Sequence, residues 1–254
     1  MHKKIDLNCD LGEWQDISQM DSDAAILDYV SSCNIACGFH AGNAAVMRKT
    51  VELALQKGVA IGAHPGFQDL EGFGRRPMPV TPQEAYELTL YQIGALHGFV
   101  RVAGGKLNHV KPHGALYNQA AKNRLLADAI ARAVKDFDPA LILYGLAGSE
   151  SIRAADSIGL TTAAEAFCDR SYQVDGSLTP RDQPGALLAL PEDSIAQVLS
   201  IVRDGTVRTL TQDDVTLAAE TICLHGDGEH ALQFAEVLTR ALREDDILIS
   251  PLRA

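Results

Sequence analysis

Short apolar runs recur along the chain, and six of them end abruptly in glycine, histidine or acidic residues. They are IDLNCDLGE (5–13), NIACGFHAG (34–42), VAIGAHPG (59–66), LNHVKPHGALY (107–117), TTAAEAFCDR (161–170) and TICLHGDG (221–228). Each begins with the β-branched or small apolar residues of a buried strand and continues into polar side chains. In parallel α/β folds the carboxyl ends of the strands face one side, where binding groups collect. The pattern therefore predicts a parallel sheet with a functional site at one end.

Stretches with helical periodicity separate these runs. One begins at Asn43, a candidate N-cap, and ends at Gly58, while another begins at Thr81 with Pro82 next and Glu84 at the capping-box position. Helices are expected over residues 21–31, 43–57, 81–104, 117–136, 149–158, 191–204 and 228–243, with a closing strand at 247–250.

The repeated order of strand and helix argues for parallel pairing throughout. Strands are expected to end near residues 8, 37, 63, 110, 144, 164 and 224. This number of parallel strands, with six polar ends that must converge, favours a closed or nearly closed TIM-like (β/α)7–8 barrel over an open doubly wound sheet.

A single domain over residues 1–254 is expected, because no linker or low-complexity segment divides the chain. The segment DRSYQVDGSLTPRDQPGAL (169–187) is rich in glycine, proline and polar residues and lacks a hydrophobic period. Unstructured loops longer than about 12–15 residues are uncommon unless they serve a function. We therefore expect a long functional loop packed over the strand ends.

Charge and cysteine usage narrow the function classes. The net charge of −11 disfavours nucleic acid and anionic membrane surfaces as partners. No apolar run approaches the roughly 18–20 residues that span a bilayer, and the N-terminus lacks the apolar core of a signal peptide. The five cysteines show no disulfide-framework spacing, which suits a reducing cytoplasm, and Cys33 and Cys37 are expected to pack in the core.

The first strand carries three polar residues on one face. Asp6, Asn8 and Asp10 alternate along it, and Glu13 follows in the loop. Two carboxylates and an amide that point into a barrel are costly unless they bind a cation, accept hydrogen bonds or exchange protons. Because the flanking Ile5 looks buried, we favour one of these roles over a solvated edge strand.

Three histidines occupy equivalent positions after strands. His40 in CGFHAG and His64 in GAHPG are bracketed by glycine, and His113 in VKPHGALY follows Lys111 on the same face. Recurrence at strand ends favours a functional role for these side chains. His109 lies within its strand and is expected to be structural.

The spacing of the candidate residues does not by itself decide whether they bind a metal ion or transfer protons. Asp10, His40, His64 and His113, together with His225 and Asp227 in HGDG, resemble a hard-metal or acid/base site. Yet the chain has no HExxH sequence and no CxxC pair, so no local metal signature supports the interpretation. A Walker sequence is also missing, so any nucleotide would be held in another way.

Several further charged residues are candidates for binding an anionic substrate. Arg75 and Arg76 follow the His64 loop in a glycine-rich segment, where guanidinium groups suit a carboxylate or phosphate, although a surface salt-bridge patch is the alternative. Arg181 in the long loop is placed to close over such a substrate. The remaining candidates at a strand end are Glu165, Asp169 and Arg170.

Eight motifs in order, covering nearly the whole chain, resemble the LamB/YcsF family, the A subunits of bacterial ATP-dependent 5-oxoprolinase. They are IDLNCDLGE, NIACGFHAG, GAHPGFQDLEGFGRR, YQIGAL, HVKPHGALYN, EAFCDRSY, GSLTPR and HGD. The chain departs from the family pattern at Trp14, at Asn43 where the family tends to have Asp, and at Cys168. None of these departures removes a candidate site residue.

The resemblance implies a distorted barrel similar to those of carbohydrate deacetylases and some glycosidases. It also implies hydrolysis of 5-oxo-L-proline to L-glutamate, coupled to ATP hydrolysis and dependent on partner subunits B and C. For this reaction we assign Asp10 with His40 or His64 as the base, and His113 as an acid or orienting group. Lys111 with an arginine would stabilise developing negative charge.

Two alternatives to this function remain. One is a stand-alone metal-dependent amidohydrolase or deacetylase with Asp10, His64 and His113 as ligands. The other is a non-catalytic subunit that binds the lactam and passes it to partners.

Overall fold

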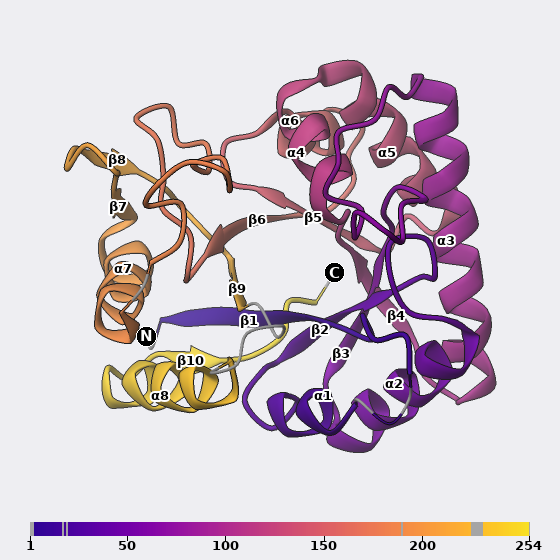
Figure 1. Ribbon diagram of the computed structural model, residues 1–254, viewed down its shortest axis with the longest axis horizontal. Helices are drawn as coiled ribbons and strands as arrows, with labels where there is room; N and C mark the ends of the chain where they lie inside the picture. Colours follow the sequence, from indigo (N-terminus) through magenta and orange to yellow (C-terminus); the bar gives the residue numbers. More distant parts are fainter. Residues whose placement is uncertain (1–2, 17, 19, 189, 225–230, 254) are drawn as a thin grey trace.

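Parallel strands close into a barrel in the computed structural model, which describes every residue except 1–2, 17, 19, 189, 225–230 and 254. Seven strands of the described chain run β1-β2-β3-β4-β5-β6-β9 around the barrel, and β9 pairs with β1 to close it (Figure 1). Their bounds are β1 Lys4–Leu11, β2 Ser32–Ala36, β3 Ala60–His64, β4 Leu107–Val110, β5 Ile142–Leu146, β6 Thr162–Phe167 and β9 Thr221–Leu224. The predicted TIM-like barrel is confirmed, with seven strands in it.

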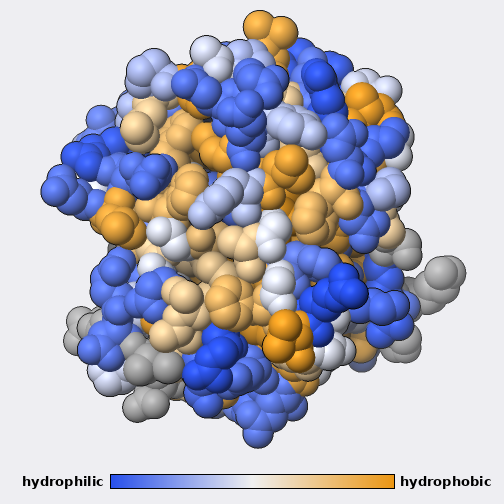
Figure 2. All heavy atoms as spheres, turned by 90° about the vertical axis from the view of Figure 1, so that its right-hand side faces the viewer, coloured by the Kyte–Doolittle hydropathy of each residue, from blue (hydrophilic) through white to orange (hydrophobic). Residues whose placement is uncertain are grey.

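Helices form the outer layer around these strands (Figure 1). They are α1 Asp21–Ile26, α2 Ala44–Lys57, α3 Pro82–Val102, α4 Gly114–Lys122, α5 Arg124–Phe137, α6 Glu150–Ser157, α7 Pro191–Asp204 and α8 Ala231–Glu244. The face of the molecule on the α3 side mixes hydrophilic and apolar side chains (Figure 2). Along α3, Ile93 and Leu96 are buried toward the barrel whereas Tyr91 is exposed. The hydrophobic core thus lies between the strands and the inner faces of the helices.

Helix ends follow the predicted signals. The Asn43 side chain accepts hydrogen bonds from two backbone N–H groups of α2, and Gly58 ends that helix with a φ of +70°. Thr81 and Glu84 form the reciprocal capping box of α3. These contacts are local, which is why the sequence signals located them.

The single helix predicted over 117–136 is wrong. The chain instead forms α4, which already begins at Gly114, and α5, which begins at Arg124. Asn123 separates them because its backbone is extended and its side-chain oxygen accepts hydrogen bonds from Leu125 N–H at 3.0 Å and Leu126 N–H at 3.3 Å. An asparagine that binds these free donors starts a new helix instead of continuing the old one. The early start of α4 also places His113 at its N-terminal boundary.

Replacing Asn123 with alanine is expected to lower the free energy of unfolding by about 1 kcal/mol, because two backbone donors of α5 lose their acceptor. Denaturant unfolding measures the change. Asn123→Asp keeps a capping oxygen and is the control, expected to stay close to the parent protein. Equal stability of the alanine and parent proteins would contradict the capping role.

Three strands of the described chain, β7, β8 and β10, lie outside the barrel ring. β7 (Thr206–Arg208) and β8 (Asp214–Thr216) form an antiparallel hairpin that the sequence pattern did not reveal. The closing strand β10 (Leu248–Ile249) pairs with the start of β1, outside the ring.

The long segment 169–187 folds back on itself over the barrel. Bridges join Arg170 to Leu187 and Tyr172 to Leu178. The Arg170 guanidinium donates to the backbone carbonyl of Thr179 at 2.6 Å. The buried Arg170 guanidinium thus holds the Thr179 part of the loop against the start of the loop, and the segment has a defined structure.

The cysteines of the described chain are all buried and free. Cys33 and Cys37 lie in the hydrophobic core, as predicted. No helix among the described residues is both long and apolar enough to cross a membrane.

Candidate active site

A cavity of about 780 Å³ opens at the carboxyl ends of the strands. Its deep end is formed by residues that end or follow three different strands, Asp10 on β1, His64 on β3, and Lys111 and His113 after β4. Its wall includes Tyr117 and Gln119 of α4, Phe167, Arg170, and residues 177–182 of the long loop. Parallel strands thus deliver separate sequence motifs to one place, as expected for a barrel of this kind.

The polar face of β1 is divided by depth. Asp6 is completely buried and accepts hydrogen bonds from Ser32 at 2.5 Å, Thr221 at 2.6 Å and Tyr144 at 3.0 Å. Burial raises the pKa of Asp6, and these donors partly offset the shift. Asp6 therefore links β1 to β2, β5 and β9 inside the barrel and does not line the cavity.

Asn8 and Asp10 lie successively nearer the cavity. Asn8 is also buried, and it donates to Glu165 Oε1 at 3.0 Å and to Thr221 Oγ1 at 2.7 Å. Asp10 lines the cavity with its side chain 10% exposed, so of the three acidic and amide groups it is the one that can meet a ligand.

Lys111 is the buried cation at the base of the site. Its Nζ lies 3.0 Å from Asp10 Oδ1, 2.8 Å from Glu165 Oε1 and 3.0 Å from Cys223 Sγ. Burial alone would lower the pKa of Lys111, but the neighbouring Asp10, Cys223 and Glu165 outweigh it and hold this pKa well above its ordinary value. The ammonium is therefore charged and anchored between two carboxylates.

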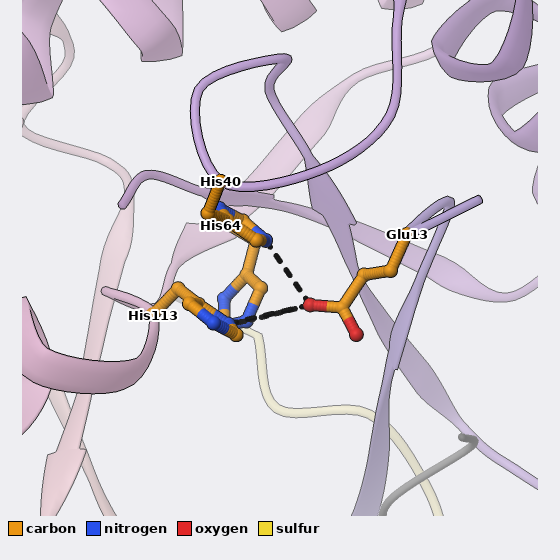
Figure 3. A group of neighbouring side chains, drawn as sticks. All are labelled: Glu13, His40, His64 and His113. Carbon is orange, nitrogen blue, oxygen red and sulfur yellow. Dashed lines mark hydrogen bonds and ion pairs between the residues drawn. The ribbon is translucent and has the colours of Figure 1, made fainter. Parts of the chain in front are cut away.

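Three histidines form a compact cluster with Glu13 (Figure 3). The His40 and His113 rings stack at 3.7 Å, and the His64 ring stands edge-on to both. Glu13 Oε1 approaches His40 Nε2 at 3.0 Å and His113 Nδ1 at 3.3 Å, while His64 Nε2 lies 3.3 Å from Asp10 Oδ2. Burial and the neighbouring imidazoles lower the pKa of His40 and of His113 well below the ordinary value. Burial therefore favours the neutral form of both rings.

The cluster also contains the donors of a candidate metal site. One ligand atom each from Glu13, His40, His64 and His113 lies within 4.8 Å of the others. Sequence spacing pointed to Asp10 and Asp227 as the acidic partners of these histidines, but the carboxylate within the described cluster belongs to Glu13. His225 and Asp227 lie outside the described residues.

The structure brings some of the candidate arginines to the cavity and not others. Arg75, Arg170 and Arg181 line it. Arg170 is mostly occupied by backbone carbonyls, and burial lowers its pKa to about 10. Arg76 is 61% exposed and pairs with Asp69, so the structure does not place it in the cavity. Asp169 and Glu165 are likewise absent from the cavity lining.

Three neighbours of the site were not singled out from the sequence. Tyr117 donates to Glu165 Oε2 at 2.7 Å, and Asn34 donates to Asp10 Oδ1 at 2.8 Å. Cys223 contacts Lys111. Tyr117 lies one helical turn beyond His113 and Asn34 has the strand parity of an inward residue, so periodicity offered a weak signal for both.

Glycines near the site make room for imidazole rings and not only for a ligand. A Cβ on Gly62 would lie 2.1 Å from His109 Nε2, and one on Gly74 would lie 2.6 Å from His40 Cβ. His109 Nε2 donates to Asn34 Oδ1 (2.8 Å), and its ring stacks on Tyr144, away from the cavity, consistent with the structural role predicted for it.

Comparisons with known proteins match nearly the full length of this chain. The family model of the LamB/YcsF family matches residues 5–254. A relative from Tolumonas auensis, named as the A subunit of 5-oxoprolinase, is 57% identical over 246 residues, covering 97% of this chain and 98% of that protein. The protein of the same name from Bacillus subtilis is 54% identical over 247 residues, with coverage of 97% and 96%.

Solved structures agree in fold. The lactam utilization protein of Thermus thermophilus superposes with a TM-score of 0.92 at 43% identity, covering 98% of this chain and 100% of that one. The Xyl-CE4 domain of a xylanase from a termite hindgut metagenome reaches a TM-score of 0.53 at 10% identity, covering 98% of this chain and 87% of that one, which shows a shared fold alone. On the family match and the full-length identity to curated relatives, this chain belongs to the LamB/YcsF family.

Proposed function

We propose that this chain is the A subunit of an ATP-dependent 5-oxoprolinase, hydrolysing 5-oxo-L-proline to L-glutamate with partner subunits B and C in the cytoplasm. The observation that carries the proposal is the Asp10–Lys111 pair at the deep end of the cavity, with arginines on its walls. The full-length relatives, which are named for 5-oxoprolinase, support the same substrate.

The charge arrangement fits a small lactam that carries a carboxylate. Arg75 and Arg181 line the outer part of the cavity, where a guanidinium can bind the substrate carboxylate. Lys111 at the base can then face the lactam oxygen. In this pose the ring carbon lies between Asp10 and the cationic groups.

ATP has a chemical role because amide resonance makes the lactam carbon a poor electrophile. Transfer of the terminal phosphoryl group to the lactam oxygen would activate this carbon. Attack by one water, with proton transfer to Asp10 and protonation of the ring nitrogen, opens the ring to an acyl phosphate. A second water then releases phosphate and glutamate. Lys111 stabilises the negative charge that develops on oxygen.

His64, His113 and Glu13 line the cavity with Asp10 and are proposed to activate and orient the attacking water, while His40 positions Glu13 and His113 from outside the cavity. Within the binding set, Asn8 and Glu165 hold Lys111 in place. Asp169, Arg76, His225 and Asp227 remain predictions from sequence.

The purified chain alone is expected to have negligible 5-oxoprolinase activity and to gain it when its B and C partners and ATP are added. The relatives are named as one subunit of 5-oxoprolinase, which motivates this expectation. Glutamate release is measured for the chain alone and with its partners, each with and without ATP. Robust turnover by the chain alone without ATP would instead favour the stand-alone amidohydrolase, and full activity of a complex containing Asp10→Asn would favour a non-catalytic lactam carrier.

A further inference from the structure

At the base of the cavity, hydrogen bonds to backbone carbonyls determine which ring nitrogen of two histidines carries hydrogen. His64 Nδ1 lies 2.7 Å from the carbonyl oxygen of Lys111, and His113 Nε2 lies 2.8 Å from that of Phe73. A carbonyl oxygen accepts hydrogen bonds and cannot donate, so both of these ring nitrogens carry hydrogen. The opposite nitrogens, His64 Nε2 and His113 Nδ1, are therefore the ring atoms that remain to present lone pairs to a ligand.

These lone pairs converge on each other and on carboxylates. His64 Nε2 and His113 Nδ1 are 2.9 Å apart. Glu13 Oε1 lies 3.3 Å from His113 Nδ1, and Asp10 Oδ2 lies 3.3 Å from His64 Nε2. Two ring nitrogens that present lone pairs to each other at 2.9 Å repel unless a proton or a metal ion lies between them, and Glu13 Oε1 lies beside the same gap.

We infer that a divalent transition-metal ion binds between His64 Nε2, His113 Nδ1 and Glu13 Oε1. With metal–ligand bonds of about 2.1 Å, adjacent donors lie ~3.0 Å apart at right angles and ~3.4 Å apart in a tetrahedron. The observed separations of 2.9, 3.3 and 3.9 Å fit this range with small adjustments of the side chains. Imidazole with carboxylate suits zinc, iron or nickel better than magnesium or calcium.

The site has the open form of a catalytic metal centre. Glu13, His64 and His113 all line the cavity, so an ion bound by them faces the space in which a ligand would lie. Catalytic zinc sites use three protein ligands and leave a further position for water or substrate. Asp10 borders that position through its contact with His64.

His40 has a different role in this arrangement. It is fully buried, does not line the cavity, and its Nδ1 has no hydrogen-bond partner among the described residues. Its Nε2 lies 3.0 Å from Glu13 Oε1, and its ring stacks on His113. His40 thus donates to the ligand carboxylate and orients both Glu13 and His113 from behind the metal.

Zinc binding tests the inference without any turnover, so it can fail or hold independently of the proposed reaction. The full-length protein, freed of any histidine tag and treated with chelator, is titrated with zinc sulfate by calorimetry, and bound metal is counted by elemental analysis. One zinc ion per chain is expected. Cobalt(II) should give the visible absorption of a site with nitrogen ligands.

Substitutions distinguish the proposed metal ligands from residues that only surround the site. His113→Asn, His64→Asn and Glu13→Gln should each weaken zinc binding by at least about 100-fold, and His40→Asn by about 10-fold to 100-fold. His97→Asn, on the outer helix α3, is the matched control and should bind as the parent does. Circular dichroism checks folding, and Glu13→Gln is the variant that disturbs packing least because its side chain is 12% exposed.

Failure of the parent protein to bind zinc, cobalt, nickel or iron(II) would overturn the inference and leave a shared proton between His64 and His113. Undiminished binding by folded Glu13→Gln and His113→Asn would overturn it as well. A protein that binds one zinc ion through these residues but lacks 5-oxoprolinase activity with its partners would retain the metal site and lose the proposed function.

Discussion

Asp10→Asn is expected to reduce the turnover of the assembled enzyme by about 10²- to 10⁴-fold, the usual contribution of a general base. Asparagine keeps the shape of the side chain but cannot take a proton from water. Lys111 retains Glu165 at 2.8 Å, so the loss of one carboxylate leaves the buried ammonium paired. We therefore expect the free energy of unfolding to change far less than the rate.

Turnover with 5-oxoproline and ATP, measured beside denaturant unfolding of the same variant, checks this expectation. Asp128→Asn on α5 is the matched control, because that carboxylate pairs with Arg124 on the surface, remote from the cavity. Activity of Asp10→Asn within about threefold of the parent would exclude Asp10 from proton transfer.

Lys111→Met is expected to abolish measurable turnover and to lower the free energy of unfolding by about 3–5 kcal/mol. The methionine fills similar space but leaves the carboxylates of Glu165 and Asp10 without their cation. Glu165 is completely buried, and an uncompensated buried charge is strongly destabilising. The size of this loss exceeds that of ordinary surface substitutions.

Denaturant unfolding provides the measurement, with Lys106→Met as the matched exposed control. Adding Glu165→Gln to Lys111→Met should restore part of the stability, since it removes the charge left behind, while activity stays absent. A Lys111→Met protein within about 1 kcal/mol of the parent, or a double variant less stable than the single one, would contradict the assignment of Lys111 as the counter-ion.

The sequence by itself determined the features that depend on near neighbours. Alternation along β1 placed Asp6, Asn8 and Asp10 on one inward face, because side chains of a strand point alternately to its two sides. The capping residues Asn43 and Thr81 located the starts of α2 and α3, because each binds backbone groups within three residues. Repetition of strand and helix was enough to indicate the barrel.

The tertiary structure alone decided which of these residues meet. Around the barrel Asp10 is level with Asn34, Asn34 with Gly62, and Gly62 with His109. This register depends on how strands far apart in the chain are staggered when the barrel closes. It explains why His109 fills the space that Gly62 leaves and bonds to Asn34, which no local pattern could indicate.

The dependence on barrel closure also explains why the sequence indicated which residues form the site but not which of them contact each other. The sequence determined that histidines and carboxylates would collect at the strand ends, because each follows its own strand. Only the folded chain decided that Glu13 lies among the histidines, that Lys111 bridges Asp10 and Glu165, and that Arg76 turns away toward Asp69. Such contacts join residues as far as 101 positions apart, and their distances depend on barrel closure and loop packing, which local sequence does not encode.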